Sequence, residues 1–156
     1  MFHLKRGQRP KSAHARSVPE AITVLAIMQS DADAAVLRGI SAAYGWKLSV
    51  VESSGAAIPY LKEQPAPVVI CDRDLAGEDW RDVLARIAAL PLAVCVLVAS
   101  RVVDASLRQQ VIQHYGYDVI CKPFQSEAVR HAVTFAWSWR GWTYRRQSGG
   151  LPAPPA

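Results

Sequence analysis

The sequence has no apolar run approaching the roughly 20 residues that cross a bilayer, although 51% of its residues are hydrophobic. Its start, MFHLKRGQRPKS, is basic but is not followed by the apolar stretch of a secretory signal. Cysteine is scarce, and Cys71, Cys95 and Cys121 are spaced by 24 and 26 positions, which fits neither a zinc ribbon nor a redox pair. We therefore expect a soluble cytoplasmic protein without membrane contact, whose cysteines are buried as small apolar side chains.

Acidic residues are outnumbered, with 13 Asp and Glu against 18 Lys and Arg. The basic surplus lies at the two ends, because residues 1–20 carry a net charge of +4 and residues 140–156 carry +3, which leaves −2 for residues 21–139. Neither end shows a regular apolar pattern. We expect a disordered basic arm over residues 1–20, one compact domain over residues 21–140 and a flexible Gly/Pro tail over residues 141–156.

The basic ends raise the question of nucleic-acid binding. The segment WRGWTYRR alternates aromatic and basic residues, which suits stacking on a single strand and neutralising its phosphates. A nucleic-acid-associated regulator that uses its basic ends is therefore one alternative. The absence of a helix-turn-helix or other DNA-binding motif argues against it.

Between the ends, apolar runs of strand length alternate with amphipathic stretches of helical length. This pattern predicts five strands and five helices in strict alternation, as in a parallel sheet covered on both faces. The expected fold is α/β, a doubly wound five-stranded parallel sheet in a three-layer sandwich. The predicted strands cover residues 22–28, 47–52, 68–72, 93–99 and 119–121, and the predicted helices cover residues 31–44, 56–62, 80–90, 104–115 and 126–140.

Local signals add detail to three of the helices. Gly45 is expected to end the first helix, because glycine readily adopts the left-handed conformation of a helix end. Pro59 is expected in the first turn of the second helix, where no backbone donor is needed. In the last helix, Trp137, Trp139 and Trp142 cannot share one face, so at least one should be exposed or in an interface. The alternative is that these rings cover the lower edge of the domain itself.

Polar residues follow three of the predicted strands, at the edge where parallel sheets bind ligands. Asp72 ends the third strand, Ser100 ends the fourth and Lys122 follows the fifth. A carboxylate, a hydroxyl and an ammonium are the groups needed to accept a phosphoryl group, since the carboxylate attacks phosphorus and the other two bind the transferred oxygens. The alternative is a structural ion pair between Asp72 and Lys122.

Three segments carry a resemblance to a known family: VVICDRDLAGEDW, VLVAS and DVICKPF. Together they resemble the receiver domain of two-component response regulators, over roughly residues 21–139. The resemblance implies a flavodoxin-like fold in which Asp72 accepts a phosphoryl group from a histidine kinase. It also implies that Ser100 is the switch hydroxyl, that Lys122 is the phosphate-binding cation and that the Lys122–Pro123 peptide bond is cis.

The sequence departs from that family after the first strand. Receivers carry two adjacent carboxylates there, which together with the phosphoacceptor hold Mg²⁺, whereas this chain has Met28 and Gln29. Of the expected metal ligands only Asp72 is left, so the resemblance implies Mg²⁺ while the two replacements argue against it. Asp31 and Asp33 lie nearby, but we expect them to serve the positive end of the first helix.

Further departures concern the switch and the loop after Asp72. Val119 stands where the family has a switch aromatic, and Tyr115 or Tyr117 could take its place. Arg73 puts a second cation beside the acceptor. The switch position itself has two possible registers, because Ala99 could occupy it instead of Ser100.

We therefore expect an atypical receiver in phosphorelay signalling rather than an enzyme, acting mainly through protein–protein interaction with weak or conditional phosphorylation at Asp72. Its partners would be a histidine kinase or other signalling protein, and a second copy bound through the last helix. One alternative is a flavodoxin-like module that binds flavin or another phosphate-bearing ligand, but no phosphate-cradling glycine loop follows the first strand. Another is an enzyme using Asp72 on a small substrate, which would need a sizeable pocket.

Overall fold

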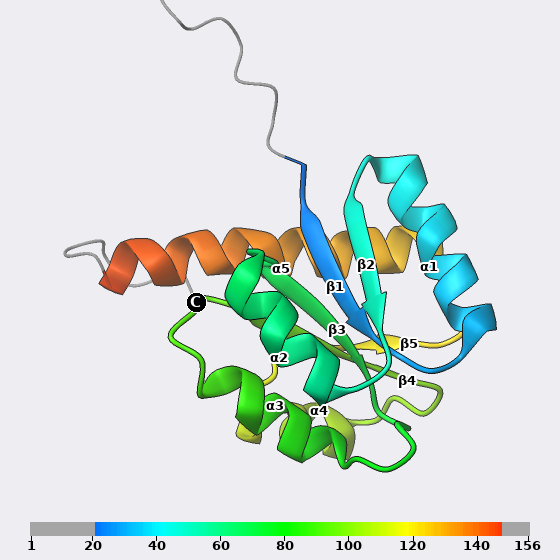
Figure 1. Ribbon diagram of the computed structural model, residues 1–156. Helices are drawn as coiled ribbons and strands as arrows, with labels where there is room; N and C mark the ends of the chain where they lie inside the picture. The colour runs from blue at the N-terminus through cyan, green and yellow to red at the C-terminus, as the bar shows by residue number, and fades with distance from the viewer. Residues whose placement is uncertain (1–20, 148–156) are drawn as a thin grey trace, which may run out of the picture.

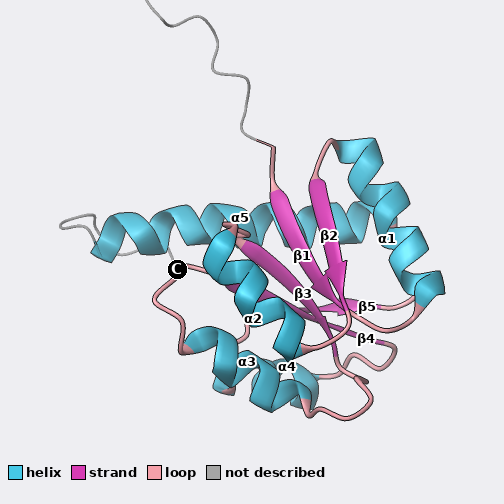
Figure 2. Ribbon diagram, in the orientation of Figure 1, coloured by secondary structure: helices cyan, strands magenta, loops and turns pink. Residues whose placement is uncertain are grey.

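The computed structural model describes residues 21–147, with side chains described up to residue 139. Strands and helices alternate strictly along the chain, as the sequence pattern predicts (Figure 2). The strands are β1 (Thr23–Ile27), β2 (Lys47–Val51), β3 (Val68–Asp72), β4 (Cys95–Ser100) and β5 (Asp118–Cys121). The helices are α1 (Asp31–Tyr44), α2 (Ser54–Glu63), α3 (Trp80–Ala88), α4 (Ala105–Gln113) and α5 (Ser126–Gln147).

The five strands form one parallel sheet in the order β2-β1-β3-β4-β5, with helices packed on both faces (Figure 1). One core cluster joins the sheet to α1 and α5, and the other joins it to α2, α3 and α4. Every residue of β3 and β4 is buried, because both faces of these inner strands are covered. The predicted doubly wound three-layer fold is therefore confirmed.

Helix boundaries follow from local chemistry. Ser30 caps α1 by accepting the Asp33 N–H at 3.2 Å, and Gly45 ends this helix with a φ of +70°, as predicted. The prediction for Pro59 is wrong, because α2 begins at Ser54 and Pro59 lies in its interior. The helix starts at Ser53 and Ser54, as the sequence predicts, with the Ser53 side chain as its cap, and this start places Pro59 beyond the first turn.

The last helix is longer than the sequence pattern indicated. It continues to Gln147 instead of ending near Arg140, and it runs past the edge of the sheet (Figure 1). Val129, Val133 and Ala136 are its fully buried residues against the sheet. Trp137 and Trp139 are 38% and 41% exposed, as expected of at least one tryptophan here.

Some sequence predictions fall outside the described part of the chain. They are the disordered arm over residues 1–20, the last residues of the predicted tail and the side chain of Trp142. Among the helices of the described residues, none combines the length and the apolar character needed to cross a membrane.

The prediction of three buried cysteines is wrong for one of them. Cys71 and Cys95 are buried, whereas Cys121 is exposed. Cys121 is the last residue of β5, an outer strand of the sheet that, within residues 21–147, pairs with β4 alone. The apolar run around Cys121 could not reveal that its strand is an edge strand.

Candidate functional site

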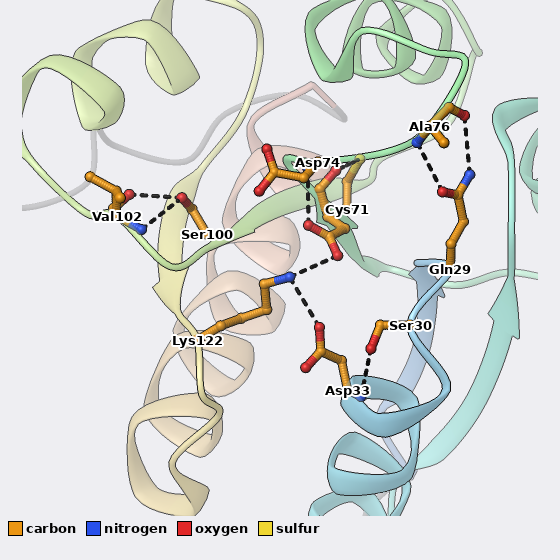
Figure 3. A network of polar contacts seen from close by, with 10 residues as sticks. Gln29, Ser30, Asp33, Cys71, Asp74, Ala76, Ser100, Val102 and Lys122 are labelled. Atoms are coloured by element: carbon orange, nitrogen blue, oxygen red, sulfur yellow. Dashed lines mark hydrogen bonds and ion pairs between the residues drawn. The ribbon is translucent and has the colours of Figure 1, made fainter.

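Asp72 lies at the carboxyl end of the central strand β3, at the end of the sheet where the functional residues were expected. Its side chain is only 7% exposed. One oxygen, Oδ2, accepts a hydrogen bond from Lys122 Nζ at 2.8 Å, and the other, Oδ1, accepts the Asp74 N–H at 3.0 Å (Figure 3). Both oxygens of the predicted phosphoacceptor are therefore engaged within the protein.

Lys122 follows the edge strand β5 and reaches across the sheet end to Asp72. The Lys122–Pro123 peptide bond is cis, as the family resemblance implied. The Lys122 ammonium lies between two carboxylates, because it also donates to Asp33 Oδ2 at 3.0 Å. Burial by itself would lower the pKa of Lys122, but the hydrogen bonds and charges of Asp72 and Asp33 outweigh it and raise the pKa above the usual lysine value. Lys122 is therefore a firmly charged cation.

Asp33 is the site residue whose role the sequence did not reveal. It was expected to serve only the start of α1, where Ser30 in fact provides the cap. Asp33 does lie in the first turn, but its carboxylate points to Lys122 and its side chain is 14% exposed (Figure 3). Its position three residues after the capping serine, in the first turn that follows a predicted strand, indicates only that it lies near this end of the sheet.

Met28 and Gln29 occupy the positions where the acidic pair was expected. Met28 is 2% exposed and packs in the apolar cluster beneath α1 and α5. Gln29 donates from Nε2 to the carbonyl oxygens of Glu52 and Ala76, each at 3.2 Å, and accepts the Ala76 N–H at 2.8 Å. Gln29 thus links the segments that follow β1, β2 and β3.

These side chains do not fit Mg²⁺ as they are arranged. Magnesium is held by oxygen ligands in near-octahedral geometry. The carboxylates of Asp33 and Asp72 are bound to Lys122, the amide oxygen of Gln29 is bound to Ala76, and the thioether of Met28 is unsuited to Mg²⁺. In residues 21–139, no group of three His, Cys, Asp or Glu side chains is placed to hold a metal ion.

Ser100 lies beside the other site residues but is not bonded to them. Its hydroxyl donates to the Val102 carbonyl at 2.7 Å and accepts the Val102 N–H at 3.2 Å (Figure 3). In the sheet register, Ala99 pairs with Asp72 and Ser100 pairs with Cys121. The structure therefore brings together Asp72 and Lys122 of the predicted set and adds Asp33. The Ser100 hydroxyl instead bonds to the backbone of Val102 in the loop that follows β4.

The loop after Asp72 is held from a second side by Glu78. The Glu78 carboxylate accepts the backbone N–H of Ser54 at 2.9 Å and also binds the Ser54 hydroxyl, which in turn accepts a hydrogen bond from Arg86 at 3.0 Å. The hydrogen bonds from Ser54, assisted by the charge of Arg86, lower the pKa of Glu78. This contact ties the β3–α3 loop to the start of α2.

Two cavities differ in position and character. A shallow one of about 460 Å³ is lined by the β3–α3 loop and the start of α3, including Arg73 and Arg81. A larger one of about 770 Å³ lies at the opposite end of the sheet, at the amino ends of the strands, where the loops leading into β3, β4 and β5 meet Trp139. The larger cavity is therefore remote from Asp72.

Comparisons with known proteins agree with this geometry. The structure resembles a signal receiver domain from Vibrio parahaemolyticus, with a TM-score of 0.72 and 19% identity over 84% of this chain and 99% of the other. It resembles NtrX from Brucella abortus with a TM-score of 0.74 and 17% identity, over 86% of this chain and 32% of the other.

A third similar structure is the receiver domain of Ssk1 from Saccharomyces cerevisiae, crystallised with the histidine phosphotransfer protein Ypd1. Its TM-score is 0.69 and its identity 13%, over 77% of this chain and 91% of the other. No curated protein sequence matches the chain. The family described as the response regulator receiver domain matches residues 24–134. The chain therefore belongs to the response regulator receiver domain family.

Proposed function

We propose that this chain is an atypical receiver in phosphorelay signalling, phosphorylated slowly or conditionally at Asp72 and acting chiefly through protein–protein interaction. The observation that carries the proposal is the state of the Asp72 carboxylate. It is almost buried, and Lys122 and the Asp74 N–H each occupy one of its oxygens. A carboxylate engaged in this way is a poorly accessible nucleophile, so attack on phosphorus requires these contacts to open.

In the proposed transfer, an oxygen of Asp72 attacks the phosphorus of a phosphohistidine on a partner protein. A P–O bond forms while the P–N bond breaks, and the departing imidazole keeps the electron pair and takes up a proton. Lys122 would bind an oxygen of the transferred group, because its ammonium already lies 2.8 Å from the acceptor. Ser100 would contribute its hydroxyl only after leaving Val102.

The donor in this proposal is a histidine kinase or a histidine phosphotransfer protein. The similar Ssk1 receiver, which was crystallised with such a phosphotransfer protein, supports this class of partner. The family match supports the same class, because response regulators act in phosphorelay signalling. Slow transfer would make recognition of the partner, rather than rapid turnover of the phosphoryl group, the main output.

The test is incubation of the full chain with acetyl phosphate and Mg²⁺, followed by intact-mass measurement. We expect the mass of one phosphoryl group to appear on a minor fraction of the protein over hours, and not to appear on the Asp72→Asn variant. Asp74→Asn is a matched control, because Asp74 is exposed and bonds to Asp72 through its backbone N–H. Complete modification within minutes would contradict slow phosphorylation, and modification that persists in Asp72→Asn would contradict the assignment of Asp72.

We also propose that a second copy of the chain binds through α5. This helix extends past the sheet (Figure 1). It exposes Phe135, Trp137 and Trp139, of which Phe135 is 64% exposed. Residues 140–147 contain three arginines and no acidic residue, whereas residues 21–139 carry a net charge of −2. The basic helix end of one copy is therefore complementary in charge to the body of another.

Light scattering coupled to size-exclusion chromatography tests this dimer. We expect a concentration-dependent dimer that weakens in the Phe135→Ala and Trp137→Ala variants. Val102→Ala, which removes another exposed apolar side chain, from the β4–α4 loop, should leave the dimer intact. A monomeric mass at every concentration would refute the proposal.

A further inference from the structure

A divalent cation in a pocket of this kind has two physical tasks. It neutralises carboxylates gathered at the strand ends, and it holds the surrounding loops in one arrangement. The contacts around Asp72 show how each task is met by a side chain of the protein itself (Figure 3).

The charge is balanced by Lys122. Its ammonium lies 2.8 Å from Asp72 Oδ2 and 3.0 Å from Asp33 Oδ2, and its side chain is 5% exposed. A cation that entered between the two carboxylates would have to displace this ammonium and leave it buried without a partner. Asp33 is therefore the residue that fixes Lys122 between two negative charges rather than beside one.

The loops are held by Gln29. Its amide donates to Ala76 O and accepts from Ala76 N, and it also donates to Glu52 O. This pattern requires a side chain that is both donor and acceptor. An ionised carboxylate at position 29 could accept from Ala76 N but would face two carbonyl oxygens without a proton to offer. The Gln29 side chain is thus suited to linking these loops, a role that a carboxylate at the same position could not fill.

We infer that Lys122, Asp33 and Gln29 organise this pocket in place of a divalent cation, so that its conformation and its reactivity are independent of Mg²⁺. The part of the inference that concerns reactivity rests on the proposed role of Asp72. Met28 is consistent with it, because its side chain is buried in the apolar cluster and offers no oxygen ligand.

The first experiment compares the thermal midpoint of the full chain in EDTA and in millimolar Mg²⁺ or Mn²⁺, with calorimetric titration of each metal. We expect no metal-dependent shift and no saturable heat for the wild type. A saturable site with a rise in the midpoint would overturn the inference, because a ligand that binds the folded state stabilises it.

The second experiment replaces the Gln29 amide with a carboxylate, in the variant Gln29→Asp. We expect this variant to melt below the wild type in EDTA and to regain part of the loss in Mg²⁺, because the new carboxylate loses the donor bonds of the exposed Gln29 amide but offers a metal ligand. Gln29→Ala should also melt below the wild type and regain none of the loss in Mg²⁺. If both variants melt as the wild type does, Gln29 does not hold the loops and the inference fails.

The third experiment separates Asp33 from the general effect of acidic residues at the start of α1. Asp33→Asn should lower the midpoint by several degrees more than Asp31→Asn, because Asp31 is an exposed first-turn acid and Asp33 binds Lys122. Equal effects would mean that Asp33 acts only on the helix end, and this would overturn its assigned role.

A phosphorylation assay distinguishes failure of this inference from failure of the proposed function. We expect equal rates of acetyl phosphate modification in Mg²⁺ and in EDTA. Modification of Asp72 only in Mg²⁺ would overturn the inference while leaving Asp72 as the acceptor. No modification under either condition would remove the proposed acceptor, and the metal titrations would then decide the organisation of the pocket by themselves.

Discussion

The two ends of the sheet treat polar and apolar groups in opposite ways. At the carboxyl ends of the strands, Asp33, Asp72 and Lys122 are largely withdrawn from solvent and bonded to one another. At the amino ends, an open cavity of about 770 Å³ is lined by loop residues and by the partly exposed ring of Trp139. The contrast teaches that the charges of Asp33, Asp72 and Lys122 are balanced within the protein, whereas the opposite end of the sheet leaves loop surface accessible to solvent.

The largest expected effect comes from breaking the internal charge balance. Lys122→Met leaves Asp33 and Asp72 facing each other without a cation, and removing one partner of a buried ion pair typically costs about 3–5 kcal/mol. Urea unfolding measures the loss. Adding Asp72→Asn to Lys122→Met should recover part of it, and a single variant as stable as the wild type would show that the ion pairs contribute little.

At the opposite end of the sheet, Gly116→Ala should destabilise the fold by about 1–3 kcal/mol through overpacking. A Cβ at Gly116 would lie 2.9 Å from the Val111 carbonyl oxygen and 3.1 Å from Leu84 Cδ2, and would also collide with the Val111 side chain. Gly39→Ala is the matched control, because nothing lies within 4 Å of a Cβ there and alanine favours the helix interior. If urea unfolding shows that both substitutions change the free energy of unfolding in the same direction, the close contacts at Gly116 do not determine its effect.

A smaller effect is expected from Glu78→Gln, and it should depend on pH. Because the folded pKa of Glu78 lies below its usual value of 4.5, the carboxylate stabilises the fold above about pH 4.5. This contribution is lost as the pH falls through the folded pKa. The stability difference between wild type and Glu78→Gln should therefore shrink below pH 4.5, as measured by urea unfolding at several pH values. A stability difference between the two proteins that stays constant from neutral to acidic pH would contradict the lowered pKa of Glu78.

The smallest effect concerns the chemical reactivity of the thiols that precede Asp72 and Lys122. Cys71 precedes Asp72 and is buried, which together with the charges of Asp72 and Glu78 raises its pKa to about 12. Cys121 precedes Lys122 and is exposed. Iodoacetamide should add one group to the native protein, at Cys121, and none to Cys121→Ser, as read by intact mass. Modification of Cys71 at a similar rate would show that the apolar core around Cys71 opens readily.

Much of this arrangement could be predicted from sequence, because it depends on chain order. Asp72 and Lys122 each follow a buried strand, and parallel strands bring their carboxyl ends to one edge. Asp33 could not be assigned in the same way, since its contact with Lys122 depends on how α1 lies over that edge. Likewise, Cys121 lies in an apolar run, but its exposure depends on β5 being the last strand of the sheet.

The contacts of Gln29 are all with main-chain atoms, those of Glu52 and Ala76, whose own side chains are exposed. The side chains at positions 52 and 76 are therefore free to change without loosening the pocket. Substitutions in these two loops can remodel the surface around Asp72 while its interior stays the same. A chain built in this way can change its outer surface without giving up the contacts that hold Asp72.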